Sequence, residues 1–447
     1  MTVLLYILGV LAFAVGIGVS IGLHEVGHLA PAKRFGVRVT QYMIGFGPTL
    51  WSRQRGETEY GVKAIPLGGY IRMIGMFPPK RGEDPRFVRR SSTGRLSVLA
   101  DQARAQSMEE LRPGDETRVF YRLSVPKKVV IMMGGPTMNL VIAAVLLTIT
   151  TSVLGMPAAT TKLGVVSDCV VPASASDQTT CAPSDPKAPA SAAGLKAGDR
   201  IVSYAGRPIS SWDTLHDQIR LSDGTAVPVV VERGGQRLNV SITPIVTDRP
   251  VYDEQGREER TASGAVRTER IGFLGVSPTQ ELQRESVTAV PGVIWQGLSG
   301  TAGVVLRIPE KMVGVAQAAF GSGERDPNGP VSIVGVGRIT GAATSDAPDS
   351  GYGLRGWLVF FLGVIAALNI ALFIFNMIPL LPLDGGHVAG ALWEGARRTV
   401  ARLRHRADPG PTDVARLLPI AYAASALLIA MSVLLIYADI VNPINLG

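Results

Sequence analysis

The sequence predicts an α-helical polytopic membrane protein that carries a membrane-associated β-loop and an inserted extracytoplasmic α+β domain. Of the 447 residues, 46% are hydrophobic and 18% are charged, whereas a soluble domain has about 25% charged residues. Four apolar stretches are long enough to cross about 30 Å of hydrocarbon as helices. Between them lie segments in which apolar and polar residues alternate, as they do in strands.

The four predicted transmembrane helices are continuous apolar stretches, and they fall within residues 1–30, 129–154, 357–390 and 417–440. We expect the first to be retained, because no basic segment precedes it and no small-residue cleavage site follows it, as a secretory signal would require. A shorter, Gly-rich stretch at Val290–Leu306 is interpreted as an interfacial or partly buried helix.

The charges of the connecting segments predict the topology. Residues 31–128 hold 19 Lys and Arg against 9 Asp and Glu, and residues 391–416 hold 6 against 3. Basic loops remain in the cytoplasm, so both are predicted to be cytoplasmic loops of a multi-pass protein in the plasma (inner) membrane. Residues 155–356 then lie outside, and both termini with them. The net charge of +8 reports this asymmetry, and no nucleic-acid partner is expected.

The first cytoplasmic loop divides into two parts. Residues 42–76 alternate in polarity between Gly and Pro breaks, which predicts short strands and hairpins. Open strand edges do not tolerate lipid, so this segment is expected to be re-entrant and to find pairing partners in protein. Residues 78–120 form a charged insert, to which the sequence assigns no role.

The outer region contains a β-rich module at residues 160–250, followed by a loop and interfacial helices at 251–356. The run ASAAGLKAG precedes a strand, a turn, a helix near 212–221 and a hairpin at Gly234-Gly235. This order predicts a PDZ-like domain, which binds extended chain termini by strand addition; the alternative is a generic α+β spacer. Both cysteines, Cys169 and Cys181, lie here, where an oxidising compartment permits a disulfide. Two free thiols are the alternative.

A His-Glu-x-x-His sequence, residues 24–28, lies near the inner end of the first predicted helix. Positions i and i+4 share a helix face, so His24 and His28 can chelate Zn²⁺ while Glu25 serves as general base. Ionisable groups within a transmembrane helix are costly and are usually functional. The structural alternative is that these residues cap the helix or face the headgroups.

A catalytic zinc site needs a third protein ligand, and Asp384 is the best candidate. Two prolines break the helix just before it, and the first and third helices run in the same direction, so both motifs lie at a similar depth. The alternatives are that Asp384 caps a helix or that His387 is the ligand. His216 lies in the outer module and His405 in the second basic loop.

Two asparagines also lie near the predicted site. Asn376 precedes the proline break, and Asn139 follows Gly134-Gly135-Pro136 at the start of the second helix. An amide side chain can hold a peptide carbonyl, stabilise an oxyanion or join helices. We favour a substrate or oxyanion role for Asn376, whereas for Asn139 helix packing is an equal alternative.

Together these segments resemble the site-2 protease family of intramembrane zinc metalloproteases, and its actinobacterial members most of all. The resemblance covers most of the chain and rests on HEVGH, GETEYGVKAIPLGGY, GGPTMN, the PDZ-like insert, DPNGPVSIVGVG and NMIPLLPLDGGH. The sequence departs from the family in its long charged insert and in its single PDZ-like module.

The resemblance implies that His24, His28 and Asp384 hold zinc and that Glu25 is the catalytic base. It also implies that the re-entrant β-loop pairs with an unwound substrate strand. The residues expected to bind substrate are Asn376, Pro379, Gly68, Gly69 and Tyr70.

The predicted function is hydrolysis of peptide bonds in the transmembrane segments of single-span proteins, such as anti-sigma factors, after a first cut has removed the ectodomain. One alternative is a catalytically inactive adaptor that holds membrane partners through its PDZ-like domain. Another is a metal transporter or sensor that uses the same ligands.

Overall fold

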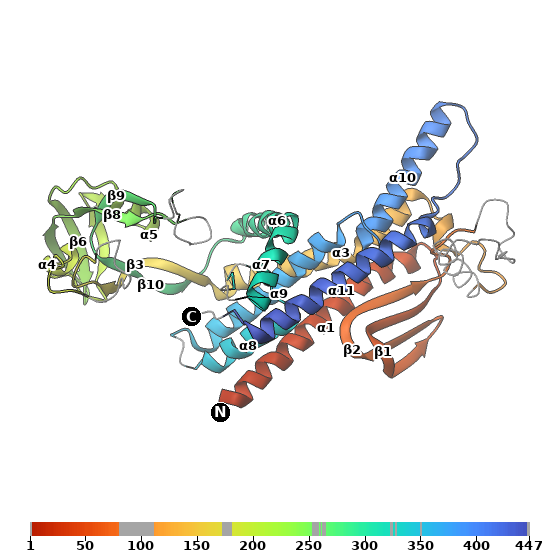
Figure 1. Ribbon diagram of the computed structural model, residues 1–447, viewed down its shortest axis with the longest axis horizontal. Coiled ribbons are helices and arrows are strands. Elements are labelled where there is room, and N and C mark those ends of the chain that lie inside the picture. Colours follow the sequence, from red (N-terminus) through yellow and green to blue (C-terminus); the bar gives the residue numbers. More distant parts are fainter. Residues whose placement is uncertain are drawn as a thin grey trace. The chain divides into compact units, whose positions relative to one another are not determined.

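The computed structural model describes residues 2–79, 111–171, 181–252, 259, 261, 265–321, 325–326, 329–348 and 351–444. Most of the charged insert predicted at 78–120 therefore lies outside the described residues. Contacts divide the chain into two compact units, Met1–Val153 with Glu285–Gly447, and Leu154–Arg284. The first unit is mainly helical and the second is mainly β-structure (Figure 1).

The first unit is built on long apolar helices. They are α1 (Thr2–Arg34), α3 (Val125–Thr148, continued by a π-helical turn at Ile149–Leu154), α6 (Val290–Leu306), α9 (Gly353–Asn376) and α11 (Leu418–Val441). Most of their apolar surface is not covered by other parts of the protein. In the most apolar 18-residue segment of α1, only 17% of the residues are buried. Side chains of this kind require lipid, which confirms a polytopic membrane protein.

Five helices among the described residues are long and apolar enough to cross a membrane, one more than the four that the sequence predicted. The additional candidate spans Val287–Leu306 and includes α6. The interfacial position that the sequence suggested for this segment stays a prediction. The other α-helices of the unit are α7 (Ile308–Phe320), α8 (Ile333–Asp346) and α10 (Asp384–Leu403).

The third predicted helix is broken before Asp384, as the two prolines suggested. The stretch predicted at 357–390 is helical as α9 only to Asn376, and α10 begins anew at Asp384. Pro379 and Pro382 in the intervening segment lack backbone N–H groups and cannot continue a helix. The first half of the loop predicted at 391–416 belongs to α10, whose high charge made it resemble a loop in the sequence.

Helices α1 and α3 approach each other closely at a point where each has a glycine. A Cβ atom added at Gly27 would collide with the carbonyl oxygen of Gly134, and one added at Gly134 would collide with the carbonyl oxygen of Gly27. Small residues allow such close backbone contact between membrane helices. Nearby, the buried Asn369 of α9 donates a hydrogen bond of 2.9 Å to Ser20 of α1. These contacts fix α1 against α3 and α9.

The predicted β-loop is a pair of long, bent strands, β1 (Val39–Arg55) and β2 (Thr58–Met73). Residues 41–44 pair with 69–72 on one side and with 59–62 on the other, while 51–55 pair with 58–62. Within the described chain, segment 69–72 thus has a strand partner on one side only. It is therefore an edge strand, to which a further strand can be added.

The second unit is an α+β domain. Its main sheet has the order β10-β3-β4-β6-β7, and β5 pairs with β4. The strands are β3 (Met156–Val166), β4 (Arg200–Tyr204), β5 (Arg207–Pro208), β6 (Val227–Arg233), β7 (Gln236–Ile242), β8 (Ile245–Pro250), β9 (Thr268–Phe273) and β10 (Val276–Gln283). The helices are α4 (Pro189–Ala192) and α5 (Trp212–Arg220).

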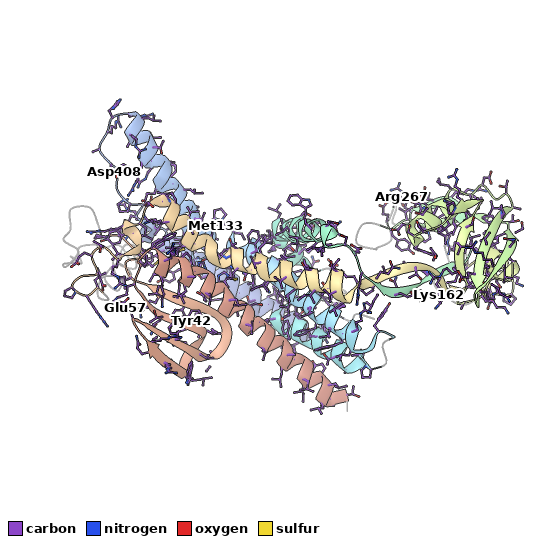
Figure 2. All side chains as sticks on the ribbon, turned by 180° about the vertical axis from the view of Figure 1, so that it is seen from behind. Tyr42, Glu57, Met133, Lys162, Arg267 and Asp408 are labelled. Atoms are coloured by element: carbon purple, nitrogen blue, oxygen red, sulfur yellow. A yellow bond between two sulfur atoms is a disulfide. The ribbon has the colours of Figure 1, made fainter. Side chains whose placement is uncertain are left out.

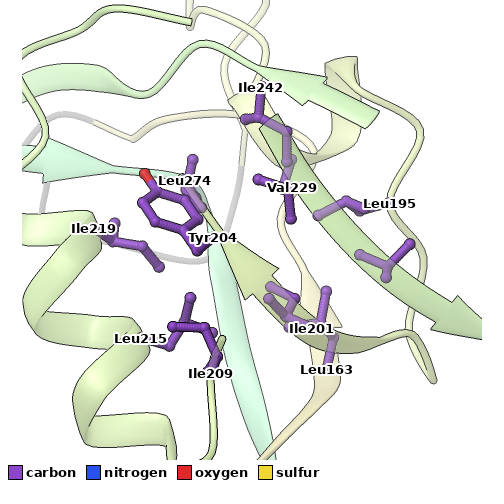
Figure 3. Close-up of a cluster of buried hydrophobic side chains, with 12 residues drawn as sticks. Leu163, Leu195, Ile201, Tyr204, Ile209, Leu215, Ile219, Val229, Ile242 and Leu274 are labelled. Carbon is purple, nitrogen blue, oxygen red and sulfur yellow. The ribbon is translucent and has the colours of Figure 1, made fainter. Parts of the chain in front are cut away.

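The core of this unit lies between the sheet and α5. Leu215 of α5, Ile201 and Tyr204 of β4, and Val229 of β6 are almost completely buried (Figure 3). Helix α5 lies where the sequence predicted one, and β6 and β7 form the hairpin at Gly234-Gly235. Strands β9 and β10, however, fall in the stretch 251–356, to which the sequence analysis assigned only a loop and helices.

The two cysteines form a disulfide, as predicted. Cys169 and Cys181 are bonded, with their Cα atoms 5.9 Å apart. Cys169 also forms an isolated β-bridge with Lys187. The bond therefore links two positions that are 12 residues apart in the chain.

Candidate metal centre

The site begins with two histidines one helical turn apart. His24 and His28 lie on the same face of α1, with their Nε2 atoms 3.2 Å apart and their rings edge-to-face. His28 is 5% exposed. Two imidazoles at this spacing offer two nitrogen ligands to one metal ion.

The break between α9 and α10 brings a carboxylate to the same point. Asp384, the first residue of α10, places Oδ2 at 3.4 Å from His24 Nε2 and 3.3 Å from His28 Nε2. One potential ligand atom from each residue falls within 4.8 Å of the others. Oδ2 is buried and makes no hydrogen bond in the described structure. A buried anion without a donor is costly, and a cation shared with the imidazoles would compensate it.

The second nitrogen of His28 is held by the neighbouring helix. His28 Nδ1 lies 2.7 Å from the carbonyl oxygen of Ile131 in α3. A carbonyl can only accept, so Nδ1 carries the proton and the lone pair of Nε2 points at the cluster. Metal-binding histidines are commonly oriented in this way.

The second nitrogen of His24 faces Asn139. The amide nitrogen of Asn139 lies 3.0 Å from His24 Nδ1, while the buried amide oxygen has no partner in the described structure. The oxygen and nitrogen of an amide are assigned from their hydrogen bonds. Exchanging them satisfies the oxygen, which then accepts the Nδ1 proton of His24 and leaves Nε2 free to bind a metal.

A glycine provides the space for the ion. A Cβ atom added at Gly135 would lie 2.6 Å from His24 Nε2 and closer still to His28 Nε2. Zn–N bonds measure about 2.0–2.1 Å, so a methyl group at this position would compete with the metal for the same volume. Because Gly135 has no side chain, the space next to the two Nε2 atoms can hold a single ion. We call this space the cradle at Gly135.

Glu25 lies between the histidines and the edge strand. It is 7% exposed, and the Ile71 backbone N–H donates a hydrogen bond to its carboxylate. A Cβ atom at Gly69 would lie 3.0 Å from Glu25 Cγ. Segment 69–72 therefore runs directly along the candidate metal site.

These groups line one cavity of about 390 Å³. Its lining residues are Ile21, His24, Glu25, His28, Gly68, Gly69, Tyr70, Ile71, Met73, Met76, Met132, Asn139, Leu372, Asn376, Pro382, Asp384 and His387. The cavity thus combines a polar cluster with flexible apolar side chains, as expected of a site that accepts an apolar peptide.

The structure brings together most of the residues that the sequence singled out. Gly68, Gly69, Tyr70 and Asn376 line the cavity together with the four residues of the predicted centre, whereas Pro379 does not line it. His387 lies in the cavity wall but outside the cluster of potential ligand atoms. His216 belongs to α5 of the other unit, and His405 follows the end of α10.

Sequence reasoning missed two contributors on α3. Gly135 was noted only as part of a motif, and the contact between Asn139 and His24 was not anticipated. The Gly-Gly-Pro run was the available signal, because glycines in a membrane helix mark close approach of a neighbour. Which residue they approach depends on how α1 and α3 cross.

Comparisons with known proteins agree with this geometry. Residues 12–407 match the family model described as peptidase family M50. The zinc metalloprotease Rip1 of Mycobacterium tuberculosis is 34% identical over 445 residues, which cover 99% of this chain and 100% of that protein. Rip1 of Mycolicibacterium smegmatis is 32% identical over 98% of both chains. The zinc metalloprotease RasP of Geobacillus kaustophilus is 26% identical, over 85% of this chain and 87% of that protein.

Proposed function

Because this chain belongs to peptidase family M50, the site-2 protease family, we propose that it cleaves the transmembrane segments of other membrane proteins. It is a membrane metalloprotease that uses Zn²⁺. The proposal concerns where in the substrate it cuts and which residues do the work. The observation that carries it is a cluster of metal-binding side chains on apolar helices, with an edge strand beside it.

We propose His24, His28 and Asp384 as the protein ligands of the zinc ion. The short distances among their Nε2 and Oδ2 atoms, the cradle at Gly135 and the unpartnered Asp384 Oδ2 support this assignment. Two His and one carboxylate leave a fourth position for water or substrate. When bound, Zn²⁺ lowers the pKa of water and polarises the scissile carbonyl.

Glu25 is the proposed general base. Its carboxylate lies in the cavity next to both histidines, where it can take a proton from the attacking water and deliver it to the leaving amine. Asn376, on the cavity wall, can donate its amide N–H groups to the substrate carbonyl or to the oxyanion that develops from it.

The substrate helix must unwind before cleavage, because a helical amide is hydrogen-bonded and shielded. Segment 69–72 lies at the open edge of the β1–β2 pair beside the site, and an unwound substrate can pair with this edge as an added strand. Gly68 and Gly69 keep this edge accessible, since neither places a side chain over it. Pairing would satisfy the backbone groups that the unwound segment exposes.

We further propose that the chain lies in the plasma (inner) membrane with the metal centre toward the cytoplasm, as the basic loops indicate. The second unit would then be extracytoplasmic and act as a PDZ-like module for peptide termini. Its strand β10 is at the edge of the sheet, which suits strand addition. Single-span proteins of the anti-sigma factor type, shortened by a first cut, are the proposed substrates.

The test is a comparison of membrane proteomes from cells that express the wild type or Glu25→Gln. Loss of a general base lowers turnover by about 10²–10⁴-fold, so single-span fragments should accumulate in the variant. Exposed Glu310, which lies on α7 outside the cavity, provides the control Glu310→Gln. Both variants should keep the zinc content of the wild type.

An unchanged fragment profile in Glu25→Gln would contradict the proposed role of this residue. Unchanged association with the same membrane proteins would then favour the adaptor. Metal flux into proteoliposomes without cleavage would favour the transporter.

A further inference from the structure

The C-terminal half of α10 exposes an apolar stripe. Leu392, Trp393, Val400 and Leu403 are 57, 61, 46 and 74% exposed. With about 100° of rotation per residue, these four and Ala396 fall within an arc of about 100° on the helix surface. Such a stripe is typical of helices that lie at a membrane interface.

A pocket beside this stripe is lined by guanidinium groups. It has a volume of about 470 Å³ and lies between α10 and residues 404–409; its lining residues are Trp393, Ala396, Arg397, Val400, Ala401, Arg404, Arg406, Ala407, Asp408 and Pro409. Figure 2 shows Asp408 in the loop beside α10.

The charge of the pocket is strongly positive. Arg404 and Arg406 are exposed, and neither has an ion-pair partner among the described residues. Arg397 bonds to the Gly410 carbonyl and the Thr412 hydroxyl, but its Nε atom is buried without a partner in that part of the chain. The acidic Asp408 is already engaged by Arg398. The pocket is therefore suited to an anion.

Contacts with α3 set the depth of this pocket. The carboxylate of Glu394 accepts hydrogen bonds of 2.8 and 3.0 Å from Lys128 Nζ, and a Cβ atom at Gly395 would lie 3.3 Å from Val125. The helix Val125–Leu154 has 30 residues, which makes it about 45 Å long. This length matches a bilayer with its headgroups. Residues 125–128 are thus at headgroup level, together with Glu394, Gly395 and the adjoining Trp393, which lines the pocket.

We propose that this pocket binds the headgroup of an anionic phospholipid, with the acyl chains along the exposed stripe of α10. A guanidinium fork matches phosphate in geometry and charge, and Trp393 lies at the level where tryptophan is enriched in membrane proteins. A soluble anion would leave the apolar stripe without a partner. This proposal does not depend on the proposed catalytic role.

The test is native mass spectrometry of the full chain in detergent, titrated with phosphatidylglycerol or with phosphatidylcholine. The variant Arg404→Ser/Arg406→Ser removes two charges from the pocket. The control Arg402→Ser/Arg122→Ser removes two exposed charges outside the pocket lining, one in the last turn of α10 and one just before the start of α3. Zinc content reports whether each variant is folded.

Wild type and control should prefer phosphatidylglycerol over phosphatidylcholine, and the pocket variant should lose about thirtyfold in phosphatidylglycerol affinity. The proposal is overturned if the control loses as much as the pocket variant. It is equally overturned if both lipids bind alike, or if millimolar inorganic phosphate displaces the bound lipid, which would assign the pocket to a free anion.

Discussion

At the scale of single residues, the candidate centre depends on a glycine at position 135. Gly135 leaves open the volume between His24 Nε2 and His28 Nε2. We expect Gly135→Ala to abolish zinc binding and peptide hydrolysis, because its methyl group would occupy the position of the ion. Metal analysis of the purified variant measures this. Gly18 on α1 faces open space, so Gly18→Ala should keep its zinc; full zinc content in Gly135→Ala would contradict the cradle.

Asn139 is expected to position His24 rather than merely to join two helices. Loss of such a partner typically lowers metal affinity 10–100-fold, so Asn139→Leu should release zinc to a competing chelator at correspondingly lower chelator concentrations. Asn139→Asp should retain most of the affinity, since a carboxylate can accept the same Nδ1 proton. Equal loss in both variants would indicate a packing role.

The β-rich unit contains a titratable contact of its own. Arg233 donates hydrogen bonds of 2.6 and 2.7 Å to Asp199, and the Lys196 backbone N–H adds a third. These donors hold the pKa of Asp199 below its ordinary value. A lowered pKa in the folded state stabilises the unit above the unfolded value of about 3.9, and this contribution disappears as pH falls through the folded pKa.

Asp199→Asn should therefore destabilise the turn at 196–199 at neutral pH and make no difference once Asp199 is protonated in the folded wild type. Hydrogen exchange of peptides from β4 and β6, corrected for intrinsic rates, measures this in the full chain. A difference between variant and wild type that grows on acidification would refute the assignment.

At the scale of secondary-structure elements, the crossing of α1 and α3 determines whether the ligands meet. Gly27 and Gly134 allow their backbones to touch. A larger side chain there must separate the helices, and overpacking of this kind costs about 1–3 kcal/mol. We expect Gly27→Leu to lower both thermal stability and zinc content. Gly363 of α9 faces open space, so Gly363→Leu serves as the control. Normal zinc content in Gly27→Leu would show that zinc binding does not depend on the close contact between α1 and α3.

The sequence predicted the elements that have strong local signals. Apolar length identified α1, α3, α9 and α11, and the i, i+4 spacing placed His24 and His28 together. The pairing of these histidines with Asp384 followed from chain direction and depth. Each of these inferences uses information that lies within a few turns of one helix or in the order of the helices.

Other elements could not be predicted because they depend on long-range contacts. Helix α10 is rich in charge, and its contacts with α3, such as the buried ion pair of Glu394 with Lys128, have no local signal in the sequence. Strand β10 acquires its place by pairing with β3, more than a hundred residues earlier. The position of Asn139 next to His24 likewise follows from helix crossing, which no local pattern encodes.

At the scale of the whole molecule, the metal centre belongs entirely to one of the two units. The proposed ligands and base all lie in Met1–Val153 with Glu285–Gly447. The other unit begins and ends on paired strands, since Met156 of β3 pairs with Gln283 of β10. A short linker can therefore replace residues 156–283 without stretching the chain.

We expect this deletion to leave zinc stoichiometry unchanged and to alter which membrane proteins are cut. Metal analysis and the comparison of membrane proteomes described above measure the two effects. Loss of zinc on deletion would show that the β-rich unit is required to form the centre.

The paired ends of β3 and β10 also have an evolutionary consequence. A segment that leaves and re-enters the chain at neighbouring points can be lengthened, duplicated or exchanged by recombination without altering the geometry of the helices that anchor it. Descendants of one ancestral peptidase could thus acquire new recognition modules while inheriting the same chemistry.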